Sequence, residues 1–218
     1  MNFPIRIPSL RRVLFLVKCA LVERRSRSRL RAAGLREGDI AIDCGANVGE
    51  MTALMRASGA TVHAFEPNPH AFAALQKRFA GDAGVICHPC AVSDAPGTVR
   101  LFLHVNSGQN PVFWSNGSSL LAEKGNVSRQ DFVEVEAVDL SAFIASLTQR
   151  VKVLKMDVEG VECRILRHLI ETGMIERIDQ LFVETHDEKI PAIAEETRAL
   201  RELVRARGWE KKIDLTWV

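Results

Sequence analysis

The sequence lacks the glycine pattern of dinucleotide-binding folds. Residues 41–50 read AIDCGANVGE, in which Gly45 is followed two positions later by Asn47 and five positions later by Glu50. The spacing G-x-G-x-x-G, which holds a pyrophosphate, is therefore missing. The chain also has no G-x-x-x-x-G-K-[ST] loop, which would cradle a nucleoside triphosphate. A glycine turn remains, and these absences indicate that its ligand is of another kind.

The sequence also shows no apolar run of membrane-spanning length near its basic start. The run from Val13 to Val22 holds ten residues and is broken by Lys18, whereas a spanning helix needs about 20. It leads into RRSRSRLR rather than into a small-residue cleavage site, so we expect no signal peptide. We expect a cytoplasmic protein that associates at most peripherally with a membrane.

Cysteines are few and odd in number, which argues against a disulfide framework. The chain has five, namely Cys19, Cys44, Cys87, Cys90 and Cys163. This usage favours a reducing compartment. The stretch Cys87-His88-Pro89-Cys90 resembles a redox or zinc motif, but no second ligand pair exists to complete a zinc site. We interpret these two cysteines as partly buried residues at the end of a strand.

Charge is small overall but unevenly spread. The net charge is +2, yet residues 1–36 hold ten Arg or Lys against the single acid Glu23, so this segment carries +9 and the remainder −7. Its apolar residues recur at helical spacing, which predicts a basic amphipathic helix ending near Arg25. We expect this extension, residues 1–36, to contact a second subunit or an anionic membrane surface; the oligomeric state stays open.

Beyond this extension, strands and helices alternate every 20 to 25 residues. Strands are expected at 39–43, 61–66, 84–93, 151–157 and 180–186, with helices at 49–57, 69–79, 161–172 and 193–207, and a last strand in 209–218. Alternating strands at 97–104 and 131–138 flank a long irregular loop, 105–130, and a short helix follows at 140–147. This pattern predicts an α/β fold: one domain, residues 37–218, with a doubly wound, mostly parallel, Rossmann-like sheet.

Polar residues follow the expected strands at their carboxyl ends, where doubly wound sheets bind ligands. These residues are Asp43 with Gly45–Gly49, Glu66, Ala91–Asp94, Asp157, and Glu184 with His186. Gly45 permits a sharp turn and a close approach to a ligand. Glu66 lies 21 residues after Gly45, where an acid accepts hydrogen bonds from both ribose hydroxyls. A nucleoside with an amino-acid tail, S-adenosylmethionine, is the ligand that remains.

Several segments together are similar to one family. They are DCGANVGEMT, AFEPNP, AVSDAPGTVRLF, SSLL, VEVEAVDLSAFI, VLKMDVEGVECRIL and LFVETH, spread over residues 40–186. In this order they resemble FkbM-type S-adenosylmethionine-dependent methyltransferases. The resemblance implies a class I methyltransferase fold and O-methylation, often of a hydroxyl in a sugar, a glycolipid or a secondary metabolite. The expected partner is a small-molecule or glycan acceptor.

The resemblance also assigns roles to residues of this chain. The methionine end of the cofactor would be lined by Asp43, Gly45, Ala46, Asn47 and Gly49. Glu66 would take the ribose, and Asp157 would lie near the sulfonium. The adenine would be flanked by Ala91, Val92 and Asp94. Ser118 and Ser119, in the irregular loop, match a family element and would close over the site.

An alcohol needs help to act as a nucleophile, from a general base or from a metal ion. Asp157, Glu184 and His186 are expected at the ends of adjacent strands, about 4.8 Å apart, so their side chains can converge. One hypothesis makes His186 the base, oriented by Glu184; the other makes the three residues ligands of a divalent cation. Imidazole prefers softer metals than Mg²⁺ or Mn²⁺, so the base is favoured and no metal is assigned.

Two alternatives to an O-methyltransferase remain open. The Arg-rich extension would suit a nucleic-acid methyltransferase, but its stretch RRSRSRLR has no interleaved aromatic residues to stack on a base. Nucleic acid is therefore not the expected partner. The other alternative is a non-catalytic module that binds a nucleoside on the same fold.

Overall fold

A six-stranded parallel sheet organises the molecule. The computed structural model describes residues 24–217 of the chain. The strands lie in the order β3-β2-β1-β7-β8-β9, and every neighbouring pair is parallel. Their bounds are β1 Ile40–Cys44, β2 Thr61–Phe65, β3 Val85–His88, β7 Val151–Met156, β8 Ile178–Val183 and β9 Ile213–Asp214. The expected doubly wound α/β fold is confirmed.

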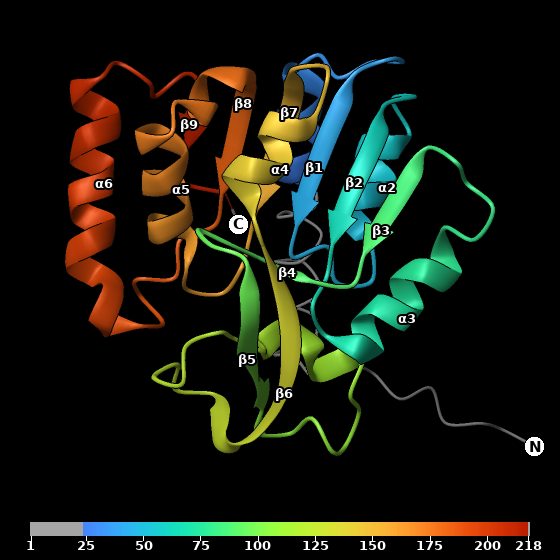
Figure 1. Ribbon diagram of the computed structural model, residues 1–218, viewed down its shortest axis with the longest axis vertical. Helices are drawn as coiled ribbons and strands as arrows, with labels where there is room; N and C mark the ends of the chain where they lie inside the picture. The colour runs from blue at the N-terminus through green and yellow to red at the C-terminus, as the bar shows by residue number, and fades with distance from the viewer. Residues whose placement is uncertain (1–23, 218) are drawn as a thin grey trace, which may run out of the picture.

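Helices cover both faces of this sheet, because successive residues of a strand point to opposite sides. Ile42 and Leu154 pack against helices α4 (Leu140–Ser146), α5 (Glu162–Glu171) and α6 (Ala194–Ala206). Ala41 and Val153 face the other way, toward α2 (Glu50–Arg56). Helix α3 (Pro69–Arg78) lies beside α2 over β2 and β3 (Figure 1). Continuous apolar strands of this kind are typical of parallel sheets buried on both faces.

A second, three-stranded sheet lies at the carboxyl ends of the large sheet (Figure 1). Its order is β4-β6-β5, with β4 Ala91–Ser93, β5 Gly97–His104 and β6 Val127–Asp139. The stretch 84–93, which was expected to hold one strand, therefore holds two, β3 in the large sheet and β4 in the small one. Pro89 separates β3 from β4, because proline has no N–H to give to the ladder. Cys87 is half-buried, Cys90 is buried, and both are free thiols beside this break, as interpreted from the sequence.

The segment 105–130 is less irregular than its sequence suggests. It contains the 3-10 turn η1 (Phe113–Gly117), and β6 begins within it at Val127. The backbones of Phe102 and Ser119 exchange two hydrogen bonds, of 2.8 and 3.0 Å, which hold the segment against β5. Two further 3-10 turns, η2 (Met174–Arg177) and η3 (Pro191–Ile193), connect later elements.

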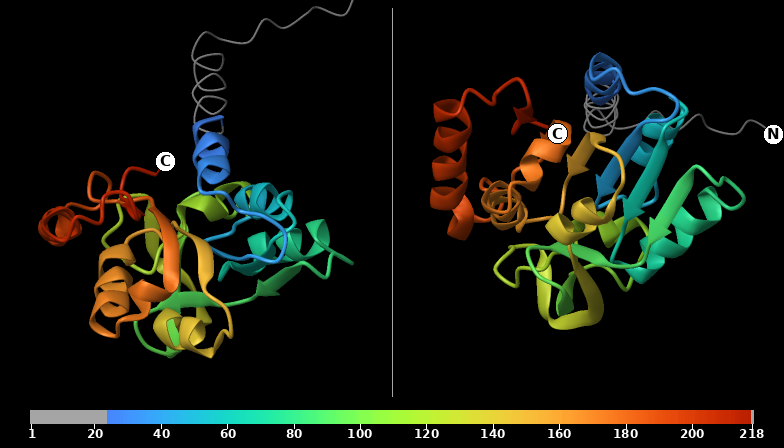
Figure 2. Two further views of the ribbon diagram at one scale, coloured as in Figure 1. Left: turned by 90° about the horizontal axis from the view of Figure 1, so that it is seen from above. Right: turned by 45° about the horizontal axis from the view of Figure 1, so that its top comes forward.

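Residues 24–32 are helical, so the helix ends seven residues later than the expected end at Arg25. Leu30 is buried in one cluster with Val153 and Trp217. Arg29 donates a 3.0 Å hydrogen bond to the Thr216 carbonyl and lies 3.4 Å from Asp214. These helical residues therefore pack beside the C-terminal strand (Figure 2). The part of the expected amphipathic helix before residue 24 lies outside the described residues.

Among residues 24–217, no helix combines the length and apolarity needed to cross a membrane.

Candidate active site

Two adjoining hollows lie at the carboxyl ends of the parallel strands. The first, here the Glu66 pocket, has about 600 Å³ of empty space, open solvent at its mouth included, and its wall includes Glu66, Ala91, Val92, Ser118 and Glu159. The second, here the Lys155 cleft, is walled by Ser26, Glu50, Lys155, Glu184 and Trp217 among others. Gly45, Asn47, Asn116 and Asp157 line both. The two hollows therefore meet at the glycine turn and at Asp157.

The turn after β1 depends on Gly45. Its φ is +75°, and a Cβ added there would lie 1.8 Å from the carbonyl oxygen of Asp157. The N–H groups of Gly45 and Ala46 both donate to the carbonyl of Phe65, at 3.0 and 2.9 Å. The turn is thus fixed between the ends of β2 and β7, and its backbone forms a wall of both hollows.

Glu66 follows β2 and is 5% exposed. Its Oε2 accepts a 2.8 Å hydrogen bond from the N–H of Asn47, and its Oε1 accepts one of 2.8 Å from the N–H of Asn68. Burial raises the pKa of Glu66 to about 7, although the two N–H groups work in the opposite direction. The carboxylate is therefore pre-positioned in the wall of the pocket, with one acceptor direction left on each oxygen.

Asp43 is fully buried and lines neither hollow. It accepts a 2.6 Å hydrogen bond from Thr52, and its other oxygen lies 3.3 Å from Lys155 Nζ. The sequence had led us to expect that Asp43 contacts the ligand. Its position is instead that of a partner for Lys155.

Lys155 is a site residue that we did not expect. It is 4% exposed on β7, donates a 2.8 Å hydrogen bond to the Gly45 carbonyl and lies 3.7 Å from Asp157. Burial alone lowers the pKa of this lysine, but the carboxylates of Asp43 and Asp157 outweigh it and raise the pKa. The signal in the sequence was a charged residue inside the apolar strand VKVLKM, which tolerates a charge only if it is paired.

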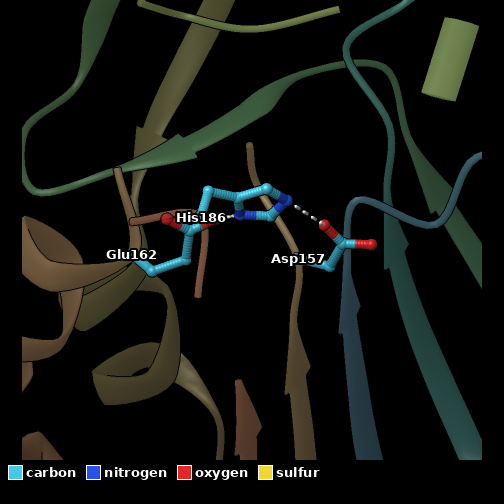
Figure 3. Close-up of side chains that lie close together, drawn as sticks. All are labelled: Asp157, Glu162 and His186. Atoms are coloured by element: carbon cyan, nitrogen blue, oxygen red, sulfur yellow. Dashed lines mark hydrogen bonds and ion pairs between the residues drawn. The ribbon is translucent and has the colours of Figure 1, made fainter. Parts of the chain in front are cut away.

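Four carboxylates surround the imidazole of His186, which is 1% exposed. Its Nδ1 donates to Glu162 at 2.8 Å, and Figure 3 shows Nε2 facing Asp157 on the opposite side. From Nε2 the distances are 3.1 Å to Glu159 and 3.6 Å to both Asp157 and Glu184. The expected convergence of Asp157, Glu184 and His186 is thus present in the geometry.

The backbone that brings these side chains together is not the expected one, because a loop and not a strand carries Glu184 and His186. Strand β8 ends at Val183, so Glu184 and His186 do not alternate along a strand. His186 is instead placed by the loop that follows, where its carbonyl accepts hydrogen bonds from the N–H groups of Lys189 and Ile190, at 3.0 and 2.8 Å.

Electrostatics argue against His186 as a free base. Burial lowers its pKa, but the nearby carboxylates of Glu159 and Glu162 raise the pKa to about 10. An imidazole that keeps its proton at neutral pH cannot accept another. The pKa of Asp157 is raised by burial; Lys155 opposes this shift, and the nearby Glu184 and Glu159 reinforce it.

The remaining expected residues divide into two groups. Ala91, Val92 and Asn47 line the Glu66 pocket, and Ala46 lines the Lys155 cleft. Asp94 lines neither, because it forms a 2.9 Å ion pair with Arg164. Gly49 also lies away from both: a Cβ there would meet Phe79 and Leu75 of α3, at 2.5 and 2.7 Å.

Of the two serines, Ser118 lines the Glu66 pocket, whereas Ser119 donates to the carbonyl of Glu159 at 2.5 Å. Glu159 has a positive φ of 60°, so this bond helps to hold an unusual turn beside His186. From the sequence, Glu159 was a further candidate for the base or the metal site, whereas Glu162 was recognisable only as an acid near the start of a helix.

The parallel sheet, the glycine turn and the acid after β2 are the features of a nucleoside-binding α/β domain. Comparison with known proteins identifies its family. Residues 43–210 match the family model of the methyltransferase FkbM domain, so the protein is a methyltransferase with a Rossmann-like fold. The chain belongs to the FkbM methyltransferase family, as the resemblance of its motifs implied.

Two curated relatives and one solved structure are similar to this chain. It is 34% identical over 180 residues to the 31-O-demethyl-FK506 methyltransferase FkbM of Streptomyces tacrolimicus, covering 70% of this chain and 67% of the relative. It is 26% identical over 162 residues to Methyltransferase 1 of Beauveria bassiana (strain ARSEF 2860), covering 68% and 65%. The chain thus spans about two thirds of the length of these relatives.

An rRNA methylase structure from Streptococcus thermophilus aligns at a TM-score of 0.40 with 11% identity, covering 79% of this chain and 78% of that one. At this score the likeness says nothing about the substrate.

Proposed function

We propose that the protein transfers the methyl group of S-adenosylmethionine to a hydroxyl of a sugar, a glycolipid or a secondary metabolite. The observation that carries this proposal is the position of Asp157, which lines both hollows at once. One hollow suits the nucleoside, the other suits the acceptor, and the methyl group would cross between them.

The residues of the Glu66 pocket fit this cofactor. Glu66 offers one further acceptor direction on each oxygen, enough for two ribose hydroxyls. Ala91 and Val92 give an apolar wall for the adenine, and the backbone at Gly45 and Asn47 suits the methionine end.

The Lys155 cleft fits a hydroxyl-rich acceptor. Glu50, Asp157 and Glu184 supply carboxylates that accept hydrogen bonds from hydroxyls, and Trp217 supplies a flat apolar surface. The relative from Streptomyces tacrolimicus is named for 31-O-demethyl-FK506, and this name supports an oxygen acceptor for this chain as well.

When bound, S-adenosylmethionine supplies a methyl group that is already activated by the sulfonium. The chain's own task is to align the acceptor oxygen with that methyl and to remove the hydroxyl proton. We propose Asp157 as the group that takes the proton. Its pKa is raised toward neutral pH, which is where a general base works best. As the acceptor oxygen takes the methyl group, its proton would pass to the Asp157 carboxylate.

The proposed setting is the cytoplasm, with the basic segment as a contact to an anionic surface or a second subunit. Most of that segment, residues 1–23, lies outside the described residues.

A transfer assay tests the proposal. The full chain is incubated with S-adenosylmethionine carrying a labelled methyl group and three sets of acceptors: glycans, hydroxylated secondary metabolites and RNA. We expect label in a hydroxyl of the first or second set, and none after Glu66→Ala. Label in RNA alone would contradict the acceptor class. Cofactor binding without transfer to any set would favour the non-catalytic alternative.

A further inference from the structure

We propose that His186 Nε2 and the carboxylates of Asp157, Glu159 and Glu184 form a binding site for a divalent cation of the Mg²⁺ and Mn²⁺ class. The cation site stands on geometry alone. Only the use of the ion in catalysis rests on the proposed function. This proposal reverses the preference for a base over a metal that the sequence favoured.

The first observation is an unpartnered nitrogen. His186 Nε2 is buried and makes no hydrogen bond, although three carboxylates lie 3.1 to 3.6 Å away. A proton on Nε2 would therefore point at none of them with good geometry. Asp157 Oδ1 is a second buried atom without a hydrogen bond, and it faces this nitrogen (Figure 3). Two ligands of one ion, each at 2.0–2.1 Å from it, lie about 3 Å apart. The distances from Nε2 to the three carboxylates approach that value.

The second observation concerns the other ring nitrogen. Glu162 accepts hydrogen bonds from the N–H groups of Val158 and Gly160 and from His186 Nδ1. The bond to Glu162 keeps a proton on His186 Nδ1, so Nε2 is the ring nitrogen left to bind an ion once it releases its own proton. A carboxylate behind a histidine in this way is the usual outer partner of a metal-binding imidazole.

The ligand atoms of Asp157, Glu162 and His186 lie within 4.8 Å of one another. Because Glu162 is occupied by its donors, we place the ion on the Nε2 side, among the other three carboxylates.

Charge supports the same conclusion. The connected network holds five carboxylates, of Asp43, Asp157, Glu159, Glu162 and Glu184, against three lysines, Lys124, Lys155 and Lys189. With the protonated imidazole one negative charge is left over, and when an ion displaces the Nε2 proton two are left, which is the charge that one divalent cation neutralises. Buried carboxylates without compensation are strongly unfavourable.

The donor set indicates which cation fits. Carboxylate oxygens suit Mg²⁺ and Mn²⁺, while an imidazole suits later transition metals. Three oxygens and one nitrogen point to Mn²⁺ as the better probe. The site touches both hollows through Asp157, so an ion there would contact the acceptor hydroxyl and lower its pKa. Asp157 would then hold the ion instead of taking the proton itself.

The test measures binding without any catalysis. Mn²⁺ is titrated into the full chain, stripped with a chelator, in the absence of cofactor and acceptor, and free Mn²⁺ is followed by electron paramagnetic resonance. We expect one site per chain. Asp157→Asn and His186→Ala should each weaken it at least tenfold. His168→Ala is the matched control, because His168 forms a 3.2 Å pair with Asp139 away from the site, and it should bind like the parent.

The proposal would be overturned if the wild-type chain bound no Mn²⁺ and calorimetry detected no binding of Mg²⁺ or Zn²⁺. Binding that survives both site variants would overturn it as well. Neither result touches the proposed function, which is tested by methyl transfer with and without chelator.

Discussion

At Gly45 the backbone conformation and the missing side chain serve separate purposes. A φ of +75° disfavours any residue with a Cβ, and the carbonyl of Asp157 occupies the space that the Cβ would need. The second constraint ties the turn to the residue on which the proposed chemistry depends. A substitution here should therefore disturb both hollows.

Gly45→Ala tests this, with Gly173→Ala as its control. Gly173 has the same φ of +75° but nothing within 4 Å of an added Cβ. We expect the control to lose about 1–2 kcal/mol of unfolding free energy from the backbone conformation alone. Gly45→Ala should lose more and should abolish cofactor binding. Equal losses in denaturant titrations would show that the contact with Asp157 is unimportant.

Glu66 should make cofactor affinity depend on pH. Its pKa in the folded chain is raised to about 7, and only the ionised form accepts hydroxyl hydrogen bonds on both oxygens. The carboxylate gains a proton as the pH falls through this value, so affinity should drop, by roughly tenfold at most between pH 8 and pH 6. Calorimetry at both pH values measures it.

Glu66→Gln is the reference for that experiment, because the ligand's own amino group also titrates. The variant should bind more weakly at pH 8 and should lose the part of the pH dependence that belongs to Glu66. If the variant and the parent change in parallel, the carboxylate does not contact the ribose.

Strand β7 carries two lysines with opposite surroundings. Lys155 is buried between Asp43 and Asp157, whereas Lys152 is partly exposed and lies 3.3 Å from Asp179. Removing the buried cation leaves the fully buried Asp43 without its partner. Removing the surface cation leaves a carboxylate that water can solvate.

We therefore expect Lys155→Met to cost about 3–5 kcal/mol of unfolding free energy, and Lys152→Met less than about 1 kcal/mol. Chemical denaturation of both variants gives the comparison. A small loss for Lys155→Met would mean that Asp43 takes up a proton or another partner.

The strand ends of the large sheet could be predicted from the sequence because a local residue pattern identifies each of them. Apolar runs followed by Gly45, Glu66 and Asp157 identify strand, turn and ligand edge together. The break at Pro89, which sends β4 into another sheet, depends on packing against β6 and left only a proline as a sign. The same applies to Asp94, whose ion pair with Arg164 on α5 is a long-range contact.

The cluster around His186 was only partly accessible to sequence reasoning. Asp157, Glu184 and His186 were expected together because parallel strands end at one edge. The roles of Glu159 and Glu162 follow from a turn with positive φ and from backbone N–H groups aimed at a carboxylate. Such geometry has no periodic pattern, so acids at a helix start look the same whether or not they hold a histidine.

On the scale of the whole molecule, the two ends of the described chain meet. Residues 24–32 pack against the C-terminal residues through Leu30, Arg29 and Trp217, and Ser26 lines the Lys155 cleft. The extension is thus in contact with the proposed acceptor site. A truncation beginning near Arg29 would remove Ser26 and cut this helix.

Removal of residues 1–23 should leave cofactor binding intact, because the residues proposed to hold the cofactor, Glu66 among them, all lie within residues 24–217. Leu30→Ala in the full chain should instead cost about 2–5 kcal/mol of unfolding free energy, since a buried leucine is lost from a cluster. Thermal denaturation and calorimetry of both proteins check these outcomes. A truncated chain that folds but no longer binds the cofactor would place residues 1–23 in the site.

The central claim is that the Glu66 pocket binds S-adenosylmethionine. Its most direct test is a calorimetric titration of the cofactor into the parent chain, Glu66→Ala and the control Glu176→Ala, whose glutamate is largely exposed near Lys212. The account predicts binding by the parent and the control. Glu66→Ala should bind at least tenfold more weakly, because hydrogen bonds to a charged group contribute about 1.5–3 kcal/mol each. Unchanged affinity in a folded Glu66→Ala protein would contradict it.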